Sequence, residues 1–167
     1  MKLNKFLIFI ITIAGCTNNK NEEFISRTEF LMNTVITLKI YDNGDKKILD
    51  EAIDRLREIE ARMSATIETS DVSQINKNAG IKPVKVHDDV YYVIEQAKYF
   101  ATISDGAYEP TIGPLVDLWN ITGSDEKERD AIPSEQEIKE KMKLVDYNDL
   151  ELMEDNFVYL NKKDMKI

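Results

Sequence analysis

The residues best suited to chemistry lie together in one stretch, SDGAYEPTIGPLVDLWN, from Ser104 to Asn120. It holds two of the four prolines, two of the six glycines and the only tryptophan of the chain. A rigid loop with free backbone N–H groups beside a flat aromatic wall suits a planar ligand that carries phosphate. An ordinary Pro/Gly connection is the competing interpretation, and the residues alone leave both open.

The prolines in this stretch predict its local backbone. Pro110 is expected to hold Glu109 in an extended conformation, and Pro114 to keep Gly113 out of a helix. Trp119 is placed in the core rather than on the wall of a ligand site. The apolar surface that follows the loop is predicted from Leu115, Val116, Leu118 and Trp119.

The only cysteine, Cys16, is the second residue with an evident chemical use. It follows a short basic head and an apolar run from Phe6 to Ile13, far shorter than the roughly 20 residues of a membrane-spanning helix. The run is typical of a secretory signal, and Ile13-Ala14-Gly15-Cys16 resembles a bacterial lipobox. A lone cysteine cannot form an internal disulfide. Residues 1–15 are therefore predicted to be a lipoprotein signal peptide, with Cys16 lipidated and residues 16–27 forming a polar tether.

This anchor predicts a protein held at the bacterial cell membrane that faces the periplasm or the extracytoplasmic space. The formal net charge is −9, and lysines and arginines form no stripe, which argues against nucleic acid as a partner. His87 is the only histidine; beside Asp88, at an expected helix start, it is interpreted as a neighbour of the cap rather than as a base.

Residue periodicity predicts an α+β domain over residues 28–167, with a sheet packed against helices. Apolar residues alternate from Phe30 to Ile40, which predicts one half-buried strand through Met32. An amphipathic helix is predicted over residues 48–63, followed by a loop from Ser64 to Pro83.

Three further elements are predicted beyond this loop. Asp88 is expected to cap a second helix, which Gly106 ends. Ser134 and Glu137 form a capping box that begins a third helix, extending to Val145. Residues 150–159 are typical of a hairpin that turns at 154–156.

Four segments resemble the ApbE family, the FAD:protein FMN transferases. Residues 106–119, GAYEPTIGPLVDLW, resemble the family signature G-A-F-D-P-T-x-G-P-L-V-x-L-W. Met32-Asn33-Thr34 is similar to the family's M-G-T. Met63-Ser64 and residues 70–76, SDVSQIN, are similar to its M-S-T-Y and D-S-E-hydrophobic-S-x-hydrophobic-N segments. The fold that this implies is the N-terminal part of an ApbE-like (T-fold-like) domain.

The resemblance implies FAD as substrate, Mg²⁺ as metal, and transfer of FMN to a threonine hydroxyl of a target protein with release of AMP. Target proteins of this kind include subunits of membrane redox complexes. By position, Met32 lies against the flavin, while Ala107, Tyr108 and Glu109 contact the dinucleotide. Tyr108 and Glu109 replace the family's Phe and Asp. Thr66 or Ile67 stands where many members have Tyr, and Asn76 is interpreted as a side chain that organises its loop.

The sequence stops at Ile167, where the family continues into a D-L-G-G-I-A-K-G motif. The resemblance places the catalytic residues and the Mg²⁺ ligands beyond this point, so none is assigned in this chain. The expectation is a fragment or a truncated reading frame. Two alternative functions stay open: an FAD pyrophosphatase that forms FMN and AMP, and a lipoprotein that binds FAD without turnover.

Overall fold

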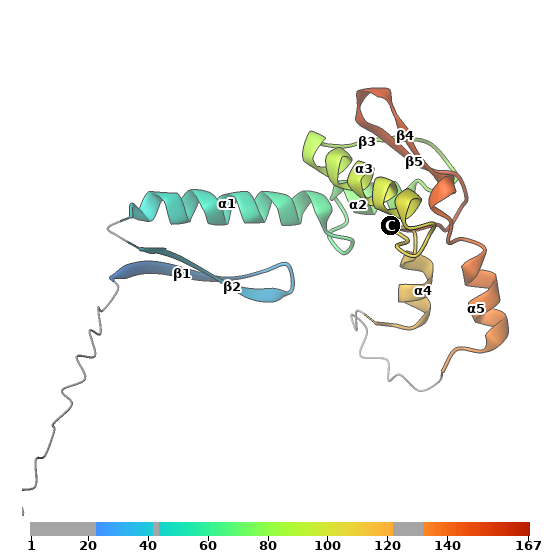
Figure 1. Ribbon diagram of the computed structural model, residues 1–167, viewed down its shortest axis with the longest axis horizontal. Coiled ribbons are helices and arrows are strands. Elements are labelled where there is room, and N and C mark those ends of the chain that lie inside the picture. Colours follow the sequence, from blue (N-terminus) through green and yellow to red (C-terminus); the bar gives the residue numbers. More distant parts are fainter. Residues whose placement is uncertain (1–22, 42–43, 122–131) are drawn as a thin grey trace, which may run out of the picture.

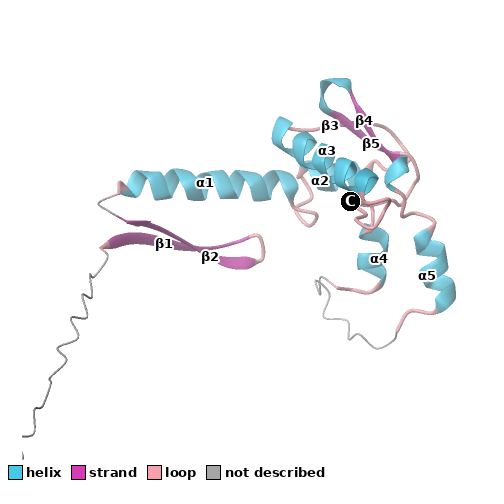
Figure 2. Ribbon diagram, in the orientation of Figure 1, coloured by secondary structure: helices cyan, strands magenta, loops and turns pink. Residues whose placement is uncertain are grey.

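The computed structural model describes residues 23–41, 44–121 and 132–167. Figure 1 shows an antiparallel hairpin lying along a long helix, with the other elements gathered beyond the C-terminal end of that helix. Figure 2 shows that this second group contains both short strands and helices. The mixed architecture, with small sheets packed against helices, confirms the predicted fold class.

The hairpin consists of β1 (Phe24–Leu31) and β2 (Thr34–Tyr41). The prediction of one strand through Met32 is wrong, because the chain reverses at Met32 and Asn33, both at positive φ. Each residue of β1 pairs with a residue of opposite parity in β2, so the parity of the inner face switches at the turn. Phe30 therefore lies on the outer face and is 67% exposed.

The β2 strand keeps the predicted alternation, with the half-buried side chains of Ile36, Leu38 and Ile40 on its inner face. Strand β1 begins at Phe24, so residues 24–27 belong to the hairpin and not to the predicted tether. Residues 1–22, including Cys16, lie outside the described part of the chain.

Helix α1 (Lys46–Met63) confirms the predicted amphipathic helix. Asp45 caps its N-terminus by accepting a hydrogen bond from the Lys47 N–H at 2.9 Å. Leu49 and Ile53 are buried on the face turned to the hairpin. Because an isolated two-stranded sheet is only marginally stable in water, this packing is what holds the hairpin.

The sequence predicts that the segment 64–83 is a loop. The prediction is wrong for residues 71–77, which form helix α2 (Asp71–Lys77). Ser70 caps the N-terminus of α2 by accepting a hydrogen bond from the Ser73 N–H at 3.1 Å, and Ile75 is the buried residue of this helix. Two turns of helix offer too little periodicity to be read from sequence, and tertiary burial of Ile75 stabilises them.

Helix α3 (Asp88–Ile103) has His87, not Asp88, at its N-cap, one residue before the predicted position. Its predicted end is confirmed: Gly106 has φ 77° and donates its N–H to the Ala101 carbonyl at 2.9 Å. Helix α5 (Glu135–Met142) begins with the predicted capping box.

Helix α4 (Gly113–Leu118) overturns the expectation that Pro114 excludes a helix. Pro114 occupies the first turn, where a backbone N–H has no intrahelical partner and proline is tolerated.

The second sheet has the strand order β3–β5–β4 and is antiparallel. It comprises β3 (Val84–Lys85), β4 (Leu150–Met153) and β5 (Phe157–Leu160), with 3-10 turns at Tyr147–Asp149 and Glu154–Asn156. The hairpin predicted at 150–159 is confirmed. The core of this part is built from Ile75, Ala79, Val86, Val90, Ile94, Leu150, Val158, Leu160 and Met165. No helix in the described ranges is long and apolar enough to cross a membrane.

Candidate functional site

Two clefts meet at the segment that follows α1. The first, called here the Met32 cleft, has a volume of about 310 Å³. Ile59, Glu60 and Met63 supply it from the end of α1, and Ser64 and Thr66 from the loop beyond. Met32 and Asn33 complete it from the hairpin turn. Thr66 is shared with the second cleft.

The second cleft, called here the Lys166 cleft, has a volume of about 590 Å³. It brings together the loop after α1, the end of α2, the start of α4 and the last two residues. Its lining comprises Ala65, Thr66, Ser73, Asn76, Lys77, Pro110, Ile112, Gly113, Val116, Asp117, Lys166 and Ile167. Both volumes are in the range of small-molecule sites.

Met32 is among the residues that line the first cleft. Its φ is 51° and that of Asn33 is 58°, a conformation that non-glycine residues rarely adopt. The Met32 N–H donates to Glu60 Oε1 at 2.7 Å, which holds the turn against α1. The side chain of Met32 is 41% exposed and available to a ligand. Contact with a flavin stays a prediction.

Glu109 is fixed inside the loop by both of its carboxylate oxygens. Oε1 accepts hydrogen bonds from the Thr111 N–H at 2.8 Å and the Thr111 hydroxyl at 2.7 Å. Oε2 accepts from the Tyr147 N–H at 3.0 Å. Thr111 is fully buried and also accepts from the Asp146 N–H at 2.9 Å. Hydrogen bonds therefore cross-link the loop between α3 and α4. The expectation of free backbone N–H groups is wrong for Gly106, Ala107, Tyr108 and Thr111, because each of these already donates within the loop or to the end of α3.

Ala107 and Tyr108 are exposed on the outside of this loop and are not among the residues that line either cleft. Trp119, predicted in the core, is instead 42% exposed at the end of α4 and lines neither cleft. The structure therefore does not gather Ala107, Tyr108 and Glu109 with Met32 around one cleft. Their predicted contacts with a dinucleotide stay predictions.

The last residues of the chain form the floor of the Lys166 cleft. Ile112 and Lys166 form a parallel β-bridge, and Lys166 pairs with Asp117. A Cβ on Gly113 would lie 2.9 Å from the Lys166 carbonyl oxygen, so this close approach requires glycine. Asn76 Oδ1 accepts from the Ile167 N–H at 2.9 Å, so this side chain, which belongs to α2 and not to a loop, holds the end of the chain rather than its own loop as predicted.

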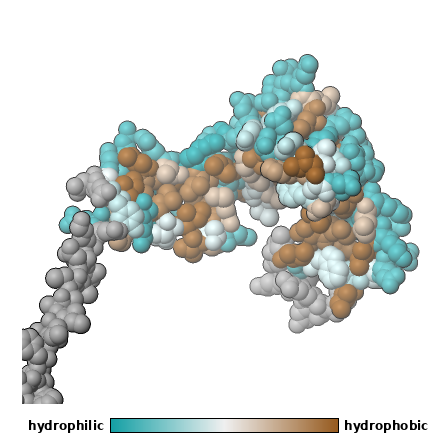
Figure 3. Space-filling model, in the orientation of Figure 1, coloured by the Kyte–Doolittle hydropathy of each residue, from teal (hydrophilic) through white to brown (hydrophobic). Residues whose placement is uncertain are grey.

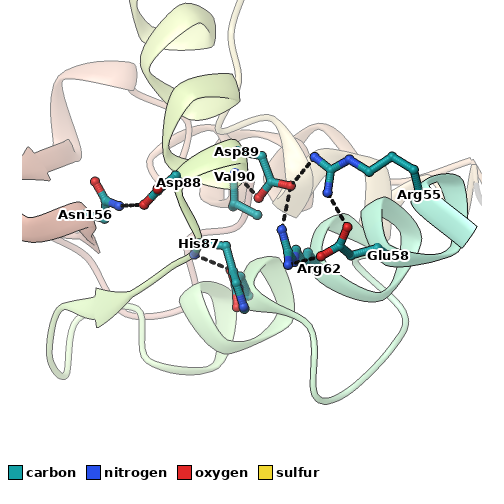
Figure 4. A network of polar contacts seen from close by, with 9 residues as sticks. Arg55, Glu58, Arg62, His87, Asp88, Asp89, Val90 and Asn156 are labelled. Carbon is teal, nitrogen blue, oxygen red and sulfur yellow. Dashed lines mark hydrogen bonds and ion pairs between the residues drawn. The ribbon is translucent and has the colours of Figure 1, made fainter. Parts of the chain in front are cut away.

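A network of charges fastens α1 to the start of α3 (Figure 4). Asp89 Oδ2 accepts from Arg55 at 2.7 Å and from Arg62 at 2.9 Å, and Glu58 bridges the same two arginines. Burial raises the pKa of the Asp89 carboxyl, but the hydrogen bonds from Arg55 and Arg62 outweigh it and leave that pKa below its ordinary value. The network fixes the end of α1, which carries the Met32 cleft.

His87 is seen in the same view (Figure 4). Its partner is Asp71. Its Nδ1 lies 2.7 Å from Asp71 Oδ2, which also accepts from the His87 N–H at 2.8 Å. This agrees with the interpretation of His87 as a structural neighbour of the helix start. It lines neither cleft.

Sequence reasoning did not identify Glu60, Lys77, Asp117 or Lys166 as residues of the clefts. No spacing signal marks them, because they come from three separate helices and the end of the chain. Within the described ranges, no group of three or more His, Cys, Asp or Glu is arranged to hold a metal ion.

The model of the ApbE family matches residues 32–167. The match covers most of the chain, and the chain belongs to the ApbE family. The matched region includes the hairpin turn, both clefts and the loop between α3 and α4.

Relatives with named activities agree with this assignment. The FAD:protein FMN transferase of Treponema pallidum is 28% identical over 155 residues, which are 90% of this chain and 42% of the relative. The enzyme of the same name from Vibrio cholerae is 29% identical over 136 residues, or 79% of this chain and 40% of the relative. The chain thus spans less than half the length of these relatives.

Solved structures agree on the fold. The ApbE protein of Thermotoga maritima has a TM-score of 0.76 and 28% identity, over 87% of this chain and 47% of that chain. The flavin transferase ApbE from Vibrio cholerae has a TM-score of 0.77 over 87% of this chain and 48% of its own. At 24% identity, the second likeness concerns the fold alone.

Proposed function

We propose that this chain is part of a flavin transferase that moves FMN from FAD to a threonine hydroxyl of target proteins. The observation that carries the proposal is the family match over residues 32–167, which includes the Met32 cleft. Relatives named FAD:protein FMN transferase support it. Subunits of membrane redox complexes are the class of target that we expect.

The proposed reaction exchanges the phosphoanhydride bond of FAD for a phosphoester bond to threonine. The threonine oxygen forms a bond to the phosphorus of the FMN half, and the pyrophosphate P–O bond to the AMP half breaks. AMP leaves with the electron pair, and the threonine proton passes to solvent or to a base. Bound Mg²⁺ would neutralise charge on the pyrophosphate, as in phosphoryl transfer generally.

The described residues can account for how FAD is bound, but they do not include groups assigned to the transfer step. The Met32 cleft offers Met32, Ile59 and Met63 as an apolar wall for a flat ring. The Lys166 cleft offers the cations of Lys77 and of Lys166, which is paired with Asp117, as partners for a phosphate group. These residues bind and orient FAD in the proposed enzyme. No described residue is assigned as the catalytic base or as a Mg²⁺ ligand.

The proposal is tested with full-length protein, FAD, Mg²⁺ and a target domain with an acceptor threonine. We expect covalent flavin fluorescence on the target and one AMP per flavin transferred. A target with the acceptor threonine changed to valine is the matched control and should stay unlabelled. AMP formed without any target would instead establish an FAD pyrophosphatase. Tight FAD binding with neither product would establish a binding lipoprotein.

We also propose that Cys16 carries a lipid anchor and that the protein faces the extracytoplasmic side of a bacterial cell membrane. The apolar run from Phe6 to Ile13 before the lipobox supports this. Multiple acyl chains at one cysteine would give a stable anchor, whereas a single chain binds only reversibly.

A further inference from the structure

Glu60 is the only acidic residue among the described residues that line the Met32 cleft. It is half-buried near the C-terminal end of α1, and its Oε1 accepts the Met32 N–H at 2.7 Å. In the described part of the chain, no hydrogen bond reaches its other oxygen, Oε2. Oε2 faces the cleft without a protein partner, so a ligand in the cleft can donate a hydrogen bond to it in place of water.

The charge of Glu60 decides which part of a dinucleotide can approach it. A carboxylate repels phosphate, so the pyrophosphate of FAD is excluded from contact with Glu60. The Lys166 cleft, which adjoins at Thr66, carries two lysines, Lys77 and Lys166, against one acid, Asp117, which pairs with Lys166. The ring system is the part of FAD that suits the Met32 cleft, where apolar side chains give it a wall.

Glu109 is the other half-buried acid near the clefts, but its two oxygens are already engaged by Thr111 and by Tyr147. A ligand donor at Glu109 would have to compete with these contacts. Glu60 holds the Met32 turn through Oε1, and its Oε2 is free to accept a hydrogen bond from a ligand. Holding the turn and binding a ligand therefore use different oxygens.

We infer that Glu60 recognises the isoalloxazine ring by accepting the N3–H of the flavin at Oε2, while Oε1 positions Met32 against the ring. This inference rests on the proposed function, because it takes FAD as the ligand. Flavins with a free N3–H are the class that the cleft would select. Glu60 is then a specificity-determining residue of the site.

The inference is tested by titrating full-length protein with FAD, N3-methyl-FAD and ADP, for wild type and for Glu60→Gln. The glutamine keeps an oxygen for the Met32 N–H but turns an NH₂ donor toward the ligand. We expect Glu60→Gln to weaken FAD binding roughly ten- to a hundredfold, as for the loss of one charged hydrogen bond. N3-methyl-FAD should bind wild type weakly and lose nothing further in the variant, and ADP should bind both proteins equally.

Glu51→Gln is the matched control, because Glu51 is an exposed acid of the same helix. Its FAD affinity should equal that of wild type. Equal FAD affinity in Glu60→Gln, or equal affinity of wild type for FAD and N3-methyl-FAD, would overturn the inference and leave the proposed function standing. The comparison of the two flavins on wild type needs no variant to fold. Absence of any FAD binding by wild type would contradict the proposed function as well.

Discussion

Glu109 fixes the loop between α3 and α4 through three hydrogen bonds to Thr111 and Tyr147. The Thr111 hydroxyl oxygen in turn accepts a hydrogen bond from the Asp146 N–H, which connects the loop near residue 110 to the segment near residue 146. The family signature thus includes side chains that hold its own backbone in shape. A ligand contact by Glu109 would come in addition to this role.

Removing the Glu109 carboxylate should therefore affect stability as well as binding. We expect Glu109→Ala to lower the free energy of unfolding by about 1.5–3 kcal/mol, because two backbone N–H groups lose a charged acceptor. FAD affinity should fall roughly ten- to a hundredfold if the carboxylate also contacts the ligand. Glu109→Asp should be milder in both. Thermal unfolding and FAD titration measure the two effects.

Glu95→Ala, at an exposed position of α3, is the control, because it removes an acid but leaves the hydrogen bonds of Glu109 intact. An unchanged melting temperature for Glu109→Ala would contradict the bracing role. Destabilisation with unchanged FAD affinity would assign Glu109 to structure alone.

At the scale of elements, α1 is the part that connects the hairpin to the rest of the molecule. Its N-terminal half packs against β1 and β2, where Arg27 links Glu29 to Asp50. Its C-terminal end is fastened to α3 through Asp89. The Met32 cleft is lined from both parts, by Met32 and Asn33 of the hairpin turn and by the end of α1 with the loop beyond it.

The attachment to α3 predicts a pH dependence. The folded-state pKa of Asp89 is lowered, so its contribution is present above the pKa of the unfolded chain, near 3.9, and is lost as pH falls through the folded value. At pH 7 we expect Asp89→Asn to lose about 1–3 kcal/mol of stability, because Arg55 and Arg62 lose their charged acceptor. Below about pH 4 the difference in unfolding free energy between Asp89→Asn and wild type should shrink, because Asp89 becomes protonated in wild type.

Urea unfolding of wild type and Asp89→Asn between pH 3 and 7 measures this dependence. Asp54→Asn serves as the control, since its ion pair with Arg57 lies in solvent and is worth little. A stability difference for Asp89→Asn that stays constant across the range would show that the Asp89 charge does not carry the attachment.

At the scale of the whole molecule, much apolar surface is exposed. Figure 3 shows apolar surface over the hairpin and α1 and around α4. Phe30 and Val35, which pair across the outer face of the hairpin, are 67% and 66% exposed. The chain spans 40–42% of the first two relatives.

The proposed membrane anchor belongs to the same scale. Cys16→Ser should move the protein from the membrane fraction to the soluble fraction, or leave an uncleaved precursor, because no cysteine remains to be lipidated. Membrane fractionation with immunoblotting measures this outcome. Thr17→Ser, beside the attachment point, should fractionate like wild type. Membrane retention of mature Cys16→Ser protein would refute the lipobox.

Local signals in the sequence determined much of the secondary structure. The capping box at Ser134, the helix end at Gly106 and the period of α1 depend on neighbours within a few residues, and all three are confirmed. The hairpin at 150–159 is confirmed for the same reason. The motifs also predicted the ApbE family, which the comparisons confirm.

The tertiary structure decided what depends on distant partners. Helix α2 forms because Ile75 is buried, and the inner face of β1 follows from pairing across a turn that alternation alone does not reveal. The partners of Glu109 lie up to 38 residues away, and Glu60 meets Met32 across 28. Sequence spacing carries no signal for such contacts, because packing brings their residues together only after the elements have formed.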